Sequence, residues 1–245
     1  MSTDSIEVAS VAARLVRDGA RAVWLFGSAA RGEARLDSDV DVLIVVDAPT
    51  EPFAIGDVQV APYTFDRLCV MATHGSLFIR HLLDEARPLR DDGSLLSRLR
   101  AAYVETSPHN HLREIRVAAG LLDVNDAAYI DLWPGLHACA GFLLRSLAYL
   151  EARRRGCFSF SMVSVLEALG DPTLESIQML RSASAPNTIL YRQALASIER
   201  YQEMPVENRF ISIEALTVNS WRSHELAYSW GLRILTRNAS RVAYG

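Results

Sequence analysis

Two apolar runs separated by a short polar stretch constrain the fold of this chain more than any other feature. The first run covers residues 22–26 and stops at Gly27 and Ser28, and the second covers residues 39–46. The second run alternates, so that every other residue shares one wholly apolar face, as in a half-buried strand. The residues between the two runs leave room for a short helix, which we place at 29–31. The segment therefore predicts two neighbouring strands in a buried sheet.

The rest of the first hundred residues supplies further elements around these two strands. Hydrophobic periodicity and turn residues separate the segments from one another. They predict a helix that begins near Asp4 and stops at Gly19, a third strand at 57–61 ended by Pro62, helices at 64–73 and 76–85, an edge strand around Pro88 and a helix capped by Ser94. Strands and helices in this order favour a mixed sheet with flanking helices.

From about residue 105 the alternating pattern gives way to long helical repeats. An apolar stripe that runs from Leu136 to Leu150 predicts one long helix, with Pro134 near its first turn and Gly156 just past its end. Further helices are predicted at 161–169, 174–182, 188–201 and 218–242. We therefore predict an α+β domain over residues 1–104, followed by an all-α helical bundle domain over residues 105–245.

Composition narrows the class of function. The chain has 245 residues, of which half are hydrophobic and 22% are charged, as is typical of a globular protein. All 25 basic residues are arginine, so a site that depends on a phosphate-binding or Schiff-base lysine is excluded. The formal net charge of −4 argues against a protein that coats a long polyanion. A nucleotide is still compatible with this charge.

Neither cysteines nor apolar segments indicate a secreted or membrane protein. Cys69, Cys139 and Cys157 are odd in number and have no paired spacing, which favours a reducing compartment over a disulfide framework. The first ten residues are polar and acidic, and no run approaches the roughly 18 apolar residues of a membrane span. We therefore expect a soluble, cytoplasmic protein without a membrane partner.

Two carboxylates at the start of the second strand are the first candidate site residues. Asp39 and Asp41 lie two positions apart on one strand face, so that their Cα atoms are expected about 6.5 Å apart. Mg²⁺ prefers hard oxygen ligands and is commonly held by a few carboxylates together with substrate phosphates. Asp57 opens the next predicted strand and is the best candidate for a third carboxylate. The three acids therefore predict a magnesium site.

The turn after the first strand suits an anion. Gly27 lets the backbone approach a ligand closely, and Ser28 offers a hydroxyl and an N–H group. Arg31 lies one helical turn further on and can donate two hydrogen bonds to one phosphate. We therefore expect Gly27, Ser28 and Arg31 to bind the phosphates of a nucleotide.

Together these residues resemble a known signature. Gly27-Ser28, Arg31-Gly32 and Ser38-Asp39-Val40-Asp41 are similar to the GSxxRG…SDxD pattern of the polymerase-β-like nucleotidyltransferase superfamily. Within it, the chain resembles the minimal nucleotidyltransferases and, because a helical region follows, the kanamycin-type aminoglycoside nucleotidyltransferases. The motif resemblance covers about residues 20–100, and beyond them only the all-α layout is similar.

The resemblance implies an enzyme that transfers a nucleoside monophosphate from a Mg·NTP to an acceptor hydroxyl and releases pyrophosphate. Ser28 and Arg31 would bind the β- and γ-phosphates, and Asp39 and Asp41 would ligate Mg²⁺, with two ions expected. Asp57 would be either the third ligand or the base, since members of the family differ on this point. ATP is the expected nucleotide, and a homodimer is expected by analogy.

The acceptor stays open. The lack of a basic surplus favours a small, aminoglycoside-like molecule as the acceptor. The alternative acceptor is a protein or tRNA, as expected of a minimal nucleotidyltransferase antitoxin. A non-catalytic module that binds a nucleotide or a partner protein is the rival of a different class. The base that activates the acceptor hydroxyl is not distinguished among five acids near the domain junction, which are Glu105, Glu114, Asp123, Asp126 and Asp131.

Overall fold

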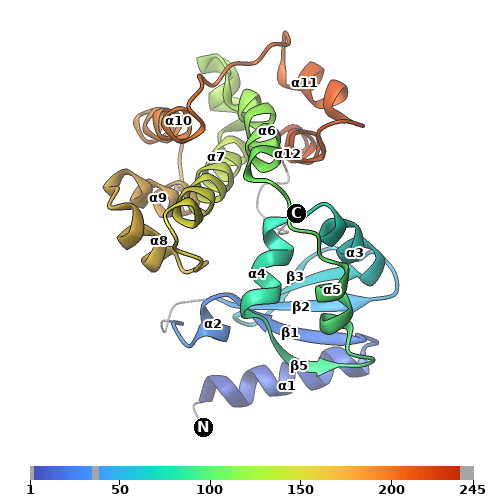
Figure 1. The fold of residues 1–245 in the computed structure, drawn as a ribbon. Helices are drawn as coiled ribbons and strands as arrows, with labels where there is room; N and C mark the ends of the chain where they lie inside the picture. Colours follow the sequence, from blue (N-terminus) through green and yellow to red (C-terminus); the bar gives the residue numbers. More distant parts are fainter. Residues whose placement is uncertain (1–2, 35–38, 238–245) are drawn as a thin grey trace. The chain divides into compact units, whose positions relative to one another are not determined.

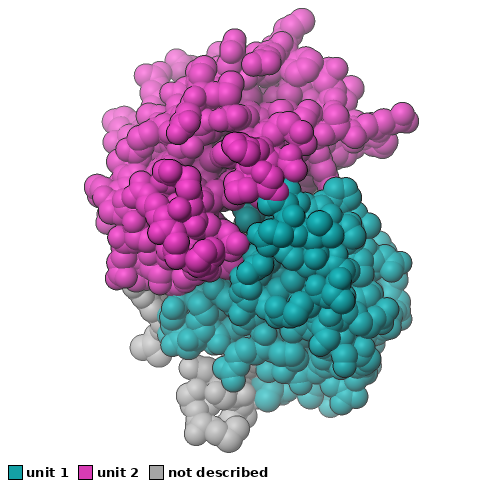
Figure 2. All heavy atoms as spheres, in the orientation of Figure 1, with its two compact units in different colours: residues 1–106, 241–244 teal, residues 107–240, 245 magenta. Residues whose placement is uncertain are grey.

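A computed structural model describes residues 3–34 and 39–237 of the chain (Figure 1). Contacts between Cα atoms divide the chain after residue 106 into two compact units, coloured teal and magenta in Figure 2. Unit 1 holds a sheet and its helices, whereas the described part of unit 2 is helical and contains no strand. The fold class expected from the sequence, an α+β region followed by an all-α region, is confirmed.

Unit 1 is built on a five-stranded mixed sheet whose strand order is β3-β4-β2-β1-β5. Its strands are β1 (Ala22–Phe26), β2 (Val40–Val46), β3 (Phe53–Ile55), β4 (Val58–Thr64) and β5 (Arg87–Asp91). The central strand β2 pairs antiparallel with β1 and parallel with β4, and the outer strands β3 and β5 are antiparallel to their neighbours. The two apolar runs of the sequence are therefore adjacent strands, as predicted.

Helices cover both faces of this sheet (Figure 1). On one face, α1 (Thr3–Arg17) packs over a core that includes Val42 and Ile44 of β2. On the other face, α3 (Phe65–Thr73), α4 (Leu77–Glu85) and α5 (Leu95–Ala102) pack over a core that includes Leu43 and Val45. Because β2 is apolar on both faces from Val42 onward, only its first residues can present polar groups.

The third predicted strand is longer than expected, and one strand was missed. Strand β4 runs to Thr64 through Pro62, and β3 forms at residues 53–55, for which the sequence predicted no element. Proline is tolerated in β4 because β3 pairs only with residues 58–60, so that β4 is the sheet edge at Pro62 and needs no N–H donor there.

The N-terminus of α5 is capped by a different residue from the one predicted. The carboxylate of Asp91 accepts hydrogen bonds from the backbone N–H groups of Leu95 at 2.7 Å and Leu96 at 3.1 Å. Ser94 makes no side-chain cap and lies in the left-handed region, with φ of 55°. The prediction of a Ser94 cap was wrong because the last residue of β5 reaches past the turn to the same N–H groups.

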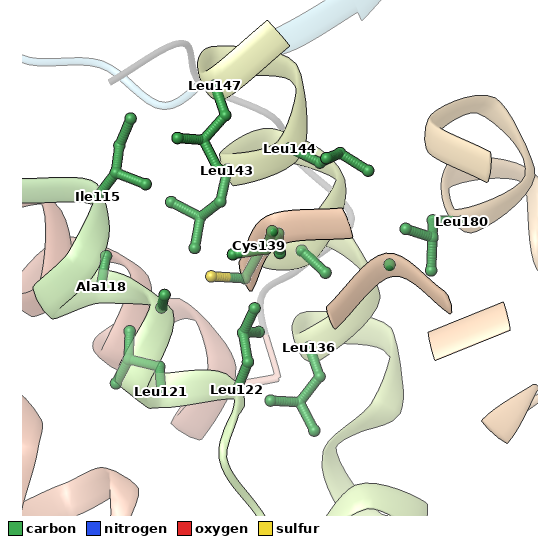
Figure 3. Packing of buried hydrophobic residues seen from close by; sticks show 14 of the residues in the cluster. Ile115, Ala118, Leu121, Leu122, Leu136, Cys139, Leu143, Leu144, Leu147 and Leu180 are labelled. Carbon is green, nitrogen blue, oxygen red and sulfur yellow. The ribbon is translucent and has the colours of Figure 1, made fainter. Parts of the chain in front are cut away.

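Unit 2 surrounds one long helix, α7 (Asp126–Arg154). Leu136, Leu143, Leu144 and Leu147 of its leucine stripe are buried. Figure 3 shows Leu143 on the side of Ile115 and Leu122, whereas Leu144 points the other way, toward the side of Leu180. The other elements are α6 (Pro108–Ala119), η1 (Gly120–Leu122), α8 (Met162–Leu169), η2 (Pro172–Glu175), α9 (Ser176–Ser182), α10 (Thr188–Gln202), α11 (Ile213–Ser220) and α12 (Glu225–Leu235). None of the described helices is long and apolar enough to span a bilayer.

Two helix predictions in unit 2 were wrong. Helix α7 begins at Asp126, with Asn125 as its cap, so Pro134 lies in the helix interior rather than near the first turn. The helix predicted at 218–242 is divided: α11 ends at Ser220 and α12 begins at Glu225, and residues beyond 237 lie outside the described residues. Helix α12 packs on α11 so closely that a Cβ atom on Gly231 would lie 2.0 Å from Thr217 Oγ1. The two helices therefore pack against each other after the break.

Candidate functional site

The turn from β1 into α2 (Gly27–Arg31) lies directly against one of the predicted acids. Phe26, the last residue of β1, pairs with Asp41 in the antiparallel ladder. Gly27 follows with a positive φ of 71°, and a Cβ atom at this position would lie 2.8 Å from Asp41 Oδ2. Both the backbone conformation and the close approach require glycine here. The two motifs of the sequence are thus joined in one site.

Ser28 lies in the first turn of α2 and is half-buried beside this contact. Helix α2 has only five residues and ends at Gly32, where φ is 76° and the backbone N–H bonds back to the Ala29 carbonyl. A helix this short contributes little dipole, so the hydroxyl and backbone N–H groups of the turn are the donors available to an anion. The structure brings Gly27, Ser28 and Asp41 together; Ser38 of the motif lies outside the described residues.

The acids follow the register of β2 and β4. Asp39 is exposed immediately before β2, and Asp41 is half-buried as its second residue. In the parallel pair, Val40 lies opposite Val58 and its N–H donates to the Asp57 carbonyl at 3.0 Å. Asp57 is therefore next to Asp39 along the sheet, at the end of the turn before β4.

The residue beside Asp41 in this register is Gln59, which is exposed. Alternation places Gln59 on the same sheet face as Asp41, because Val58 and Val60 point into the core under α1. The neighbour closest in register to the buried acid is thus an amide, whereas Asp57 is level with the exposed acid. The sequence shows that Gln59 and Asp57 share one face of β4. It does not show which of them lies beside Asp41, because that depends on the register of β4 against β2.

These residues offer a divalent cation two carboxylates rather than a complete set of protein ligands. Among the residues that the structure describes, no group of three His, Cys, Asp or Glu side chains lies close enough together to hold a metal ion. Asp39 and Asp41, two positions apart on one strand, supply two hard oxygen donors, and Mg²⁺ is commonly held by one or two carboxylates plus substrate phosphates and water. Asp57 as a third ligand stays a prediction.

Arg31, which was predicted to donate hydrogen bonds to a phosphate, binds two carboxylates in the structure. Its Nε donates to Glu33 Oε2 at 2.8 Å, and its Nη1 donates to Glu85 Oε2 on α4. Burial on its own would lower the pKa of Arg31, but the hydrogen bonds and charges of Glu33 and Glu85 outweigh it and the pKa is raised. The guanidinium is therefore a permanent cation, and two of its five N–H donors are used by these carboxylates.

Glu85 is held in turn by a histidine from the same helix. His81 Nε2 lies 2.8 Å from Glu85 Oε2, and the His81 ring meets Phe26 edge-on with centroids 6.0 Å apart. Burial would raise the pKa of Glu85, but His81 and Arg31 outweigh it and the pKa is lowered. Sequence reasoning missed both residues. Their spacing of four residues on a predicted helix indicated that the two side chains could contact each other. The local sequence did not indicate their contact with Arg31, which is 54 positions from Glu85.

Comparison with known proteins agrees with this geometry. Residues 10–113 match a family model described as a nucleotidyltransferase domain. No curated protein matches the chain. The matched segment contains β1, α2, β2 and β4, and so includes every residue of the site described above.

Proposed function

We propose, on the premise that residues 10–113 are a nucleotidyltransferase domain of the polymerase-β-like superfamily, that this chain is a magnesium-dependent nucleotidyltransferase. Such a domain implies a nucleotide substrate and an acceptor. The specific reaction is transfer of a nucleoside monophosphate, AMP in the first instance, from an NTP to a hydroxyl of a small molecule. Units 1 and 2 would correspond to a catalytic domain at 1–104 and a helical domain at 105–245.

One observation carries the proposal: the contact of Gly27 with Asp41. The Gly27 backbone, which a phosphate can approach, lies within a few ångströms of the Asp41 carboxylate, which suits a cation. A site that bound only an anion would gain nothing from a carboxylate at this position, because the two negative charges would repel each other. A nucleotide that arrives with a divalent cation satisfies both halves of the site.

The residues then take separate roles. Asp39 and Asp41 hold the cation, and the turn at Gly27 and Ser28 with Arg31 orients the triphosphate. When bound, Mg²⁺ neutralises the phosphate charge that develops during an in-line displacement. The acceptor oxygen forms a bond to the α-phosphorus, the bond to pyrophosphate breaks, and the hydroxyl proton passes to a base. Asp57 is a candidate for that base or for a further ligand.

The small-molecule acceptor rests on charge. With a formal net charge of −4 and no lysine, the chain lacks the basic surplus that a tRNA acceptor would need. A protein acceptor is the closest alternative within the same reaction class. A non-catalytic nucleotide-binding module is the alternative of a different class, and one observation favours it: no third acid gathers with Asp39 and Asp41 among the described residues.

The test is a transfer assay with matched variants. The protein is incubated with each α-³²P-labelled NTP, Mg²⁺ and a panel of aminoglycosides, other hydroxyl compounds, tRNA and proteins. We expect labelled product and pyrophosphate with the wild type and neither with Asp39→Asn or Asp41→Asn. Asp47→Asn is the control, because Asp47 is exposed just past the far end of the same strand.

Three results separate the alternatives. Transfer that survives both Asn substitutions would contradict the roles of the two acids. Tight binding of Mg·NTP without transfer to any acceptor would favour the non-catalytic module. Failure of the wild type to bind any Mg·NTP would rule out both.

A further inference from the structure

The two carboxylates on Arg31 differ in kind. The Glu85 side chain is 10% exposed, comes from α4 and is also held by His81. The Glu33 side chain is 44% exposed and lies only two residues beyond Arg31 in the chain. The Arg31 side chain itself is 18% exposed. One partner is thus a buried anchor, and the other covers the guanidinium from the solvent side.

The edge of Arg31 that Glu33 covers is useful to a nucleotide. Phosphate oxygens bind arginine in the same forked geometry as a carboxylate, and Nε is one of the donors of that fork. Glu33 now accepts from Nε at 2.8 Å, whereas Glu85 accepts from Nη1. A phosphate could therefore take the place of Glu33 while Glu85 keeps the guanidinium where it is.

The energies favour exchange at Glu33 rather than at Glu85. An exposed ion pair contributes little, because water and salt screen it, and its loss costs a small free energy. Removing one partner of a buried pair leaves an uncompensated charge, which is far more costly. A phosphate with more negative charge than a carboxylate can displace Glu33 but not Glu85.

We propose that Glu33 is an internal phosphate mimic that occupies Arg31 until a nucleotide phosphate replaces it, and that Glu85 is the positioning residue that keeps Arg31 in place during the exchange. The inference rests on the proposed function, because the incoming anion is the triphosphate of the substrate. It makes Glu33 a competitor of the substrate within the same chain.

Binding of Mg·NTP to Glu33→Gln tests the exchange. This variant keeps the size of the side chain and removes its charge, so we expect the affinity for Mg·NTP to rise about two- to fivefold, the range of an exposed ion pair. Asp92→Asn is the matched control. Asp92 accepts from Arg90 Nε at 2.7 Å with the same spacing of two residues, and its removal changes the net charge equally.

A double-mutant cycle shows whether the effect passes through Arg31. In an Arg31→Met background, Glu33→Gln should no longer change the affinity, because the group for which carboxylate and phosphate compete is absent. A purely structural role of Glu33 would change thermal stability in both backgrounds. Inorganic pyrophosphate serves as a second probe that does not depend on the base of the nucleotide, and its affinity should rise in the same way.

The outcomes are distinct. Equal tightening in Glu33→Gln and Asp92→Asn would mean a general charge effect and would overturn the proposal. Weaker binding of Mg·NTP to Glu33→Gln than to the wild type would overturn it as well. So would an equal gain in affinity from Glu33→Gln in the wild-type and Arg31→Met backgrounds. A wild type that binds every Mg·NTP poorly would instead show that the proposed function has failed, and this inference with it.

Discussion

Replacement of Gly27 by alanine tests the contact on which the site depends. Two costs are expected. The residue has φ of 71°, where a non-glycine residue is destabilised by roughly 1–2 kcal/mol. A Cβ atom would also lie 2.8 Å from Asp41 Oδ2, closer than van der Waals contact allows, so the carboxylate must move. Overpacking of this kind typically adds about 1–3 kcal/mol.

Gly32 provides the matched control for the first of these costs. It also has a positive φ, 76°, at the other end of the same short helix, but a Cβ atom there meets nothing within 4 Å. Gly32→Ala should therefore show the backbone cost alone, about 1–2 kcal/mol. The difference in unfolding free energy between Gly27→Ala and Gly32→Ala isolates the displacement of the Asp41 carboxylate.

The assay has two readouts. Urea denaturation of the two variants gives the difference in stability, and titration with Mn²⁺ followed by electron paramagnetic resonance gives the affinity of the acid pair. We expect Gly27→Ala to be the less stable variant and to lose Mn²⁺ affinity, whereas Gly32→Ala keeps it. Equal stability and equal Mn²⁺ affinity in the two variants would refute the argument that Gly27 positions Asp41.

Two further results are expected in unit 1. Asp91→Ala should lower the free energy of unfolding by about 1 kcal/mol, because it removes the cap of α5. Ser94→Gly should leave the free energy of unfolding unchanged or raise it, because Ser94 has φ of 55°. Urea denaturation compares the two variants, and a larger loss of stability in Ser94→Gly would contradict the assignment of the cap. The lowered pKa of Glu85 means that its contribution is complete above its unfolded value of 4.5 and disappears as pH falls through the folded value. Glu85→Gln should therefore flatten the loss of stability on acidification below about pH 4.5, as followed by urea midpoints, and an unchanged acid profile would contradict this.

The sequence predicted best those features that depend on short-range pattern. The run at 22–26 is β1, and the alternation that starts at Asp39 leads into β2 with the predicted apolar face under α1. Residues 42–45 are nevertheless buried on both faces, because α3, α4 and α5 cover the other one. Gly27 and Asp41 could be assigned to one site because only a short connection separates their strands.

Features that depend on distant partners could not be predicted. The level of β4 against β2, which places Gln59 rather than Asp57 beside Asp41, is set by the packing of the whole sheet. The anchoring of Arg31 by Glu85 depends on how α4 lies over β1. The division of residues 218–242 into two helices accompanies the close packing of Gly231 on Thr217.

The absence of lysine acquires a sharper meaning from these contacts. Arg31 is the cation that we propose for the triphosphate, yet its charge is already opposed by Glu33 and Glu85. With Asp39 and Asp41 nearby, these five side chains carry an excess of negative charge, so a bare triphosphate would be repelled. On the proposed function, a divalent cation would serve attraction as well as chemistry, and nucleotide affinity should depend more steeply on Mg²⁺ than in a site with a free lysine. Titrating NTP binding against Mg²⁺ measures that dependence, and appreciable affinity for metal-free NTP would contradict it.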